Sequence, residues 1–182
     1  MEPPLWVFGY GSLIWDPGFP VARSVIARLD GWHRSFCMHS IHYRGTATDP
    51  GLVLALDAAP GGACLGVGFQ VTPGAEAETL AALRKRELIS NAYLERWLPV
   101  TLATGETVEA VSYVIDPDHG QYCGGLDLEA QAQIIARAAG ERGPNRDYLL
   151  HTVAHLQSLG ISDPDLCWLA TRVRALGNDP VS

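Results

Sequence analysis

Short apolar runs alternate with turn-forming residues along the first 71 positions, a pattern typical of β-strands. The apolar run at residues 6–8 predicts a buried strand that ends at Gly9. Similar runs predict strands at residues 21–29, 32–39, 52–57 and 64–71. An Asp-Gly pair separates the first two of these four runs, and Ala-Pro-Gly-Gly separates the last two. Both separators predict turns between neighbouring strands.

A helical pattern begins after Thr72-Pro73-Gly74 and predicts a helix over residues 75–90. Strands are expected next at residues 96–102 and 107–115, followed by helices at 128–139 and 145–159. Asp163-Pro164 supplies an N-cap and a first-turn proline for a last helix that extends to about residue 176. This order predicts an α+β fold with a mainly antiparallel sheet that can close into a small barrel. We expect a single domain over residues 1–182.

Composition restricts the partners that the protein can have. The chain has 182 residues, of which 47% are hydrophobic, and its net charge is −7 from 13 basic and 20 acidic side chains. No basic stripe is present, which argues against nucleic acid and against an anionic membrane surface as partners. No apolar run reaches the roughly 18 residues that a membrane span needs, and no signal-peptide pattern opens the sequence. We expect a cytoplasmic protein without an obligate protein partner, either an enzyme acting on a small molecule or a binding module.

The helix predicted over residues 75–90 places one carboxylate on its apolar face. At about 100° per residue, Glu87 lies between the directions of Leu80 and Leu83, which should face inward. Burial raises the pKa of a carboxyl group toward the range useful for general acid and base catalysis. The same position also suits an ion pair with Arg84 or with an arginine elsewhere, and the pattern alone leaves both interpretations open.

The segment Gly9-Tyr10-Gly11-Ser12 follows the first predicted strand. Its glycines let the backbone approach a ligand and turn N–H groups toward negative charge, and Ser12 adds a hydroxyl. The third glycine and the helix of a dinucleotide-binding fingerprint are missing. A purely structural turn is the alternative interpretation.

Other reactive side chains give weaker patterns. The four cysteines, without a C-x-x-C pair, favour small buried hydrophobic roles over zinc or redox chemistry. Cys123 could act as a nucleophile, but no orienting base accompanies it in the sequence. Two histidine pairs lack a third ligand, so we expect no metal site: His39 with His42, and His151 with His155.

Several motifs together resemble the ChaC family, the glutathione-specific γ-glutamylcyclotransferases. They occur in family order and cover nearly the whole chain. The motifs are Phe8-Gly9-Tyr10-Gly11-Ser12-Leu13-Ile14-Trp15, Arg34-Ser35-Phe36-Cys37-Met38, Tyr43-Arg44-Gly45-Thr46, residues 50–56, Arg86-Glu87-Leu88, Gln121-Tyr122-Cys123-Gly124 and residues 143–149.

The resemblance implies a small, mixed, mainly antiparallel β-barrel flanked by helices. It also implies conversion of glutathione to 5-oxoproline and cysteinylglycine, a lyase reaction without metal or cofactor. By motif position, Glu87 would be the general acid and base. The substrate-binding residues would be Tyr10, Gly11, Ser12 and Leu13 in the glycine turn, with Arg44 and Tyr122 in the pocket.

Three alternatives remain beside this expectation. They are a cyclotransferase for other γ-glutamyl dipeptides or amines, a non-catalytic protein that binds a γ-glutamyl metabolite, and a plain interaction module with Glu87 paired and the turn at Tyr10 closed to ligand. One departure from the family also stands out. Animal members tend to have Gly-Gly-Tyr after the Arg-Glu segment, whereas this chain has Asn91-Ala92-Tyr93.

Overall fold

The computed structural model describes residues 2–89 and 91–178, which fall into two compact units. The first unit is formed from Met1–Ser35 and Ala55–Gly120, and the second from Phe36–Leu54 and Gln121–Ser182. The expectation of one domain over residues 1–182 stays a prediction.

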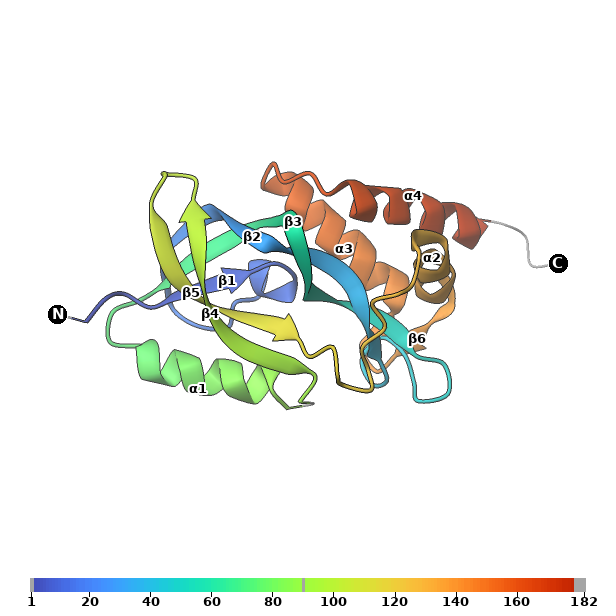
Figure 1. Ribbon diagram of the computed structural model, residues 1–182. Coiled ribbons are helices and arrows are strands. Elements are labelled where there is room, and N and C mark those ends of the chain that lie inside the picture. The colour runs from blue at the N-terminus through green and yellow to red at the C-terminus, as the bar shows by residue number, and fades with distance from the viewer. Residues whose placement is uncertain (1, 90, 179–182) are drawn as a thin grey trace. The chain divides into compact units, whose positions relative to one another are not determined.

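Five strands form a closed barrel in the order β1-β3-β2-β4-β5 (Figure 1). The pairs β1/β3, β2/β4 and β4/β5 are antiparallel, whereas β1/β5 and β3/β5 are parallel. The barrel is therefore mixed and mainly antiparallel, and the expected α+β class is confirmed. The strands are β1 (Trp6–Gly9), β2 (Val21–Ser40), β3 (Gly51–Val71), β4 (Tyr93–Leu102) and β5 (Thr107–Ile115).

Two predicted turns are wrong. Strand β2 continues through Asp30-Gly31, and β3 continues through residues 59–62. Gly31 (φ +85°) and Gly61 (φ +80°) adopt the left-handed conformation inside these strands. A glycine in this conformation also occurs at β-bulges, where a strand bends and twists without ending. The expected pairs of short strands are therefore two long ones.

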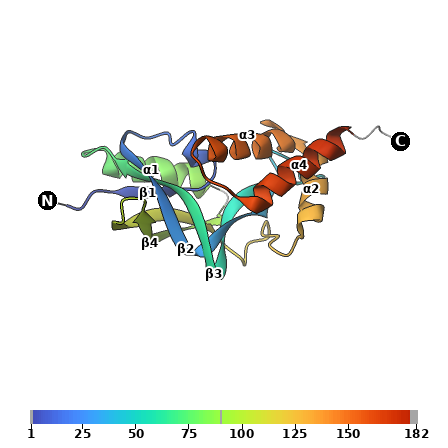
Figure 2. The ribbon, with the colours of Figure 1, turned by 90° about the horizontal axis from the view of Figure 1, so that it is seen from above.

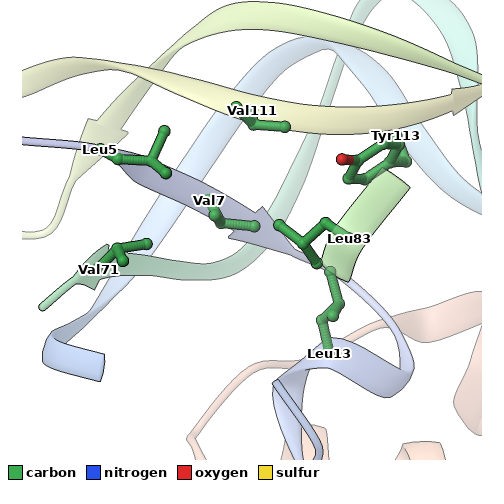
Figure 3. Packing of buried hydrophobic residues seen from close by; sticks show 7 residues of the cluster. All are labelled: Leu5, Val7, Leu13, Val71, Leu83, Val111 and Tyr113. Atoms are coloured by element: carbon green, nitrogen blue, oxygen red, sulfur yellow. The ribbon is translucent and has the colours of Figure 1, made fainter. Parts of the chain in front are cut away.

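The core of the first unit joins the barrel to α1 (Glu76–Glu87), which is shorter than the predicted helix over residues 75–90. Residue 90 itself lies outside the described residues. Leu83 is 2% exposed and points from α1 toward the barrel side chains (Figure 3). The cluster consists of Leu5, Val7, Leu13, Val71, Leu83, Val111 and Tyr113.

The second unit contains three helices that pack on one another, as Figure 2 shows: α2 (Leu128–Arg137), α3 (Asn145–Ser158) and α4 (Pro164–Asn178). The Asp163 side chain accepts a bond from the Leu166 N–H at 3.2 Å, which confirms the expected N-cap. A short hairpin, β6 (Ala139–Gly140) and β7 (Gly143–Pro144), was not expected from the sequence. In the part of the chain that is described, no helix combines the length and apolar character required for a bilayer crossing.

Asn91 lies between α1 and β4 and has a left-handed backbone with φ +56°. By the resemblance given above, animal members of the family tend to carry glycine at this position. Asparagine and glycine are the residues that most readily adopt this conformation. The backbone shape that glycine favours is thus kept here by a residue that tolerates it.

Replacing Asn91 with valine should lower the free energy of unfolding by about 1–2 kcal/mol, because a β-branched side chain is strained in the left-handed region. Asn91 is exposed, so little packing is lost with its side chain. Asn91→Gly serves as the matched control and should stay close to the parent stability. Urea unfolding of the three proteins tests this; equal stability of the valine and glycine variants would contradict it.

Candidate functional site

Glu87 is the last residue of α1 and lies one turn after buried Leu83. Its side chain is only 17% exposed. This agrees with the inward-facing position that the helical pattern predicted. Burial raises the pKa of the Glu87 carboxyl group above its ordinary value, and the neighbouring Arg86 charge opposes this effect.

Arg84 does not pair with Glu87. Its Nε and Nη2 groups donate to the two carboxylate oxygens of Glu95 at 3.0 and 2.9 Å. The Tyr113 hydroxyl donates to the same carboxylate at 3.1 Å, and these bonds hold the pKa of Glu95 below its ordinary value. The ion pair of Glu87 is instead with Arg86, whose Nε lies 3.5 Å from Oε1.

The glycine-rich segment continues from β1 into a short 3₁₀ helix, η1 (Ser12–Ile14). The Tyr10 side chain is buried, and its hydroxyl donates to the Tyr113 carbonyl at 2.8 Å. Leu13 belongs to the core cluster. A Cβ on Gly9 would stand 2.8 Å from the Phe69 ring, so glycine here serves the contact between strands.

Two arginine side chains donate hydrogen bonds to the glycine-rich segment and to the residues that follow it. Arg34 is buried, and its Nη1 donates to the Tyr10 carbonyl at 2.6 Å. Arg86 donates from Nη1 to the Asp16 carbonyl at 2.8 Å and from Nη2 to Ser12 Oγ at 3.2 Å. Within the first unit, these bonds connect the glycine-rich segment with the end of α1 that carries Glu87.

The remaining predicted site residues, Arg44 and Tyr122, belong to the second unit. Arg44 Nη1 donates to the carbonyls of Arg142 and Pro144 at 2.9 and 3.2 Å. Its guanidinium also lies over the Tyr148 ring, 5.6 Å from the centroid. Tyr122 forms an antiparallel bridge with Met38 near the end of β2.

The weaker candidates show no reactive arrangement. Burial raises the pKa of the Cys123 thiol to about 11, which disfavours the thiolate that a nucleophile requires. The His151 and His155 rings stack with their centroids 4.6 Å apart. Across residues 2–89 and 91–178, no three His, Cys, Asp or Glu side chains gather where they could share a metal ion.

Sequence reasoning missed the two arginines that brace the glycine-rich segment and the Glu95–Tyr113 contact. Arg34 and Arg86 lie within motifs that resemble the ChaC family, which was a usable signal for both. Glu95 gave no such signal, because its bond with Arg84 joins a helix to a strand that begins after an irregular loop.

The architecture is that of the γ-glutamyl cyclotransferases. It matches a crystal structure of a yeast γ-glutamyl cyclotransferase specific to glutathione, with a TM-score of 0.86 and 22% identity over 97% of this chain and 98% of that one. A second structure, titled γ-glutamyl cyclotransferase, matches with a TM-score of 0.59 and 16% identity over 92% of this chain and 86% of that one. At these identities the likeness establishes the fold.

Sequence comparison identifies the family. The model of the ChaC-like protein family matches residues 5–176. The glutathione-specific γ-glutamylcyclotransferase of Escherichia coli is 38% identical over 175 residues, covering 96% of this chain and 75% of that protein. Human glutathione-specific γ-glutamylcyclotransferase 1 is 33% identical over 177 residues, with 95% and 78% covered. The chain therefore belongs to the ChaC family, as the motifs implied.

Replacing Glu87 with glutamine should stabilise the folded protein at neutral pH. A carboxyl group whose pKa is raised by folding destabilises the fold progressively as pH rises from the unfolded pKa to the folded pKa. The gain in melting temperature for Glu87→Gln should therefore be larger at pH 8 than at pH 5.

Glu95→Gln is the matched control with the opposite sign, because folding lowers the pKa of Glu95. This variant should lose more stability at pH 5 and pH 8 than at pH 3, because the stabilisation by a lowered pKa is present above the unfolded pKa and is lost as pH falls through the folded pKa. Melting curves of both variants at these pH values provide the measurement. A pH-independent change for Glu87→Gln would show that burial does not shift its pKa.

Proposed function

We propose that this ChaC-family enzyme is a glutathione-specific γ-glutamylcyclotransferase that releases 5-oxoproline and cysteinylglycine. The observation that carries the proposal is the buried Glu87 carboxyl group, linked through Arg86 to the glycine-rich segment. The glutathione-specific names of the bacterial and human relatives support the substrate.

The reaction needs a base and then an acid at one place. The α-amine of the γ-glutamyl group attacks its own γ-amide carbonyl, and a new C–N bond closes the five-membered lactam. The amine loses a proton, the γ-amide C–N bond breaks, and the leaving cysteinyl nitrogen gains a proton. Glu87 accepts the first proton and delivers the second, a task suited to a carboxyl group of raised pKa.

The attack creates negative charge on the carbonyl oxygen. N–H groups of the turn at residues 9–13 donate to this oxygen, and Tyr10, Ser12 and Leu13 shape the turn that presents them. Gly11 is the N-cap of η1 and offers no side-chain acceptor that would compete for the first N–H groups. Because both reacting groups belong to one substrate molecule, binding the folded substrate supplies much of the rate enhancement.

We also propose Arg44 and Tyr122 of the second unit as substrate-binding residues, from their motif positions. Arg44 pairs with a glutathione carboxylate, for which a guanidinium fork is well suited. Its bonds to the β6–β7 hairpin hold the guanidinium in one place before substrate arrives. The proposal for Tyr122 rests on its motif position in the ChaC resemblance.

The proposed reaction transfers protons without a redox change, so its chemistry calls for no cofactor. We place the enzyme in the cytoplasm with glutathione as its small-molecule partner. The net charge of −7 argues against nucleic acid and membrane partners, and no obligate protein partner is proposed. Fractionation of cells that produce the protein tests its location: recovery in the membrane fraction would contradict this placement.

Glu87→Gln should reduce 5-oxoproline formation from glutathione by more than tenfold, because the amide cannot exchange the proton. Mass spectrometry of the product with purified protein is the measurement, and γ-glutamyl-alanine serves as the competing substrate. Glu109→Gln, an exposed change on β5, is the control and should retain activity. Turnover above about a tenth of the parent would reject Glu87, and preference for γ-glutamyl-alanine would reject glutathione specificity.

Gly11→Val should lower kcat by about 10²-fold, because a branched side chain blocks the close approach of substrate to the turn N–H groups. Gly11→Ala should show a smaller loss in the same assay. Urea unfolding confirms that each variant is folded. Parent-like kinetics in folded Gly11→Val would leave the turn with a structural role alone.

A further inference from the structure

One guanidinium group contacts three features of the candidate site. The Nη1 and Nη2 groups of Arg86 bond the Asp16 carbonyl and the Ser12 hydroxyl, and Nε lies 3.5 Å from Glu87 Oε1. Ser12 begins η1 and Asp16 lies just beyond its end, so Arg86 bonds both sides of this short helix. The Arg86 side chain is two-thirds buried, with 33% exposed.

The geometry uses the planar fork of arginine. Its separate N–H groups point in fixed directions and can serve three partners at once, whereas a lysine ammonium is a single point charge on a flexible stem. Arg84 lies two residues earlier on α1 and donates through Nε and Nη2 to Glu95. The two neighbouring arginines therefore have different partners.

We infer that Arg86 is a positioning residue that fixes the η1 turn relative to Glu87 and keeps the Glu87 carboxylate ready to act as the base. This inference rests on the proposed function. It adds a requirement that neither the fold nor the catalytic carboxyl group supplies alone: the proton acceptor and the oxyanion donors must be held together. Arg86 meets it with a bond to Ser12, 74 residues away in the sequence.

The charges around Glu87 explain how Arg86 keeps the Glu87 carboxylate ready to act as the base. Tyr113 on β5 also interacts electrostatically with Glu87, and it stays neutral because burial raises its pKa. From the turn, the Asp16 carboxylate lies 4.0 Å from Arg86. On α1, Arg86 opposes the rise that burial causes in the pKa of Glu87. Loss of the Arg86 charge should therefore raise this pKa further.

Two substitutions separate position from charge. Arg86→Gln removes the charge, so the acid limb of the kcat/KM profile should move to higher pH, with about a tenfold loss at pH 7 that partly recovers at higher pH. Arg86→Lys keeps the charge, so its acid limb should stay in place while kcat falls several-fold because the turn loses its fork of bonds. Arg84→Gln is the matched control and should leave the profile unchanged.

The pKa of Glu87 is measured independently of turnover by NMR titration of its side-chain carboxyl carbon. It should rise in Arg86→Gln and stay near the parent value in Arg86→Lys and Arg84→Gln. Parent-like profiles and titrations in both Arg86 variants, or equal effects from Arg84→Gln, would overturn the inference. If the parent protein forms no 5-oxoproline, the proposed function fails, while the titration still tests the effect of Arg86 on Glu87.

Discussion

Withdrawal of one carboxyl group from water is the constraint on which the candidate site depends. Glu87 is buried at the end of α1, where the partial negative charge of a helix C-terminus acts in the same direction as desolvation. A fold selected only for stability would place an apolar residue there. The position therefore combines a cost in stability with the chemical property that proton transfer requires.

Two arginines in the last turn of α1 have different relations to the Glu87 carboxyl group. Arg84 pairs with Glu95. Arg86 lies beside Glu87, opposes the rise that burial causes in its pKa, and bonds Ser12 of the η1 turn. Tyr113 on the barrel strand β5 links Glu95 with Tyr10. Its hydroxyl donates to Glu95, and its carbonyl accepts from the Tyr10 hydroxyl. Helix, turn and sheet thus share a small set of polar contacts around a largely apolar core.

The sequence predicts structure well where hydrophobic periodicity decides it. It misleads where one backbone conformation, such as a left-handed glycine, is compatible with two different motifs. Helical spacing alone predicts that Glu87 lies on the same face as Leu83, and in the structure both side chains are largely buried. A left-handed glycine suits a hairpin turn and a bulge equally, so the sequence around Gly31 and Gly61 predicts turns where the strands in fact continue. The bond from Arg86 to Ser12 has no local signature, because its partners are 74 residues apart in the sequence.

The contacts of α1 also restrict how the chain can vary in length. Side chains rotate by about 100° with each added helical residue, so an insertion between Leu83 and Glu87 would turn either the leucine or the acid away from the barrel. Helix α1 ends at Glu87, so an insertion after this residue would leave the directions of Leu83 and Glu87 unchanged.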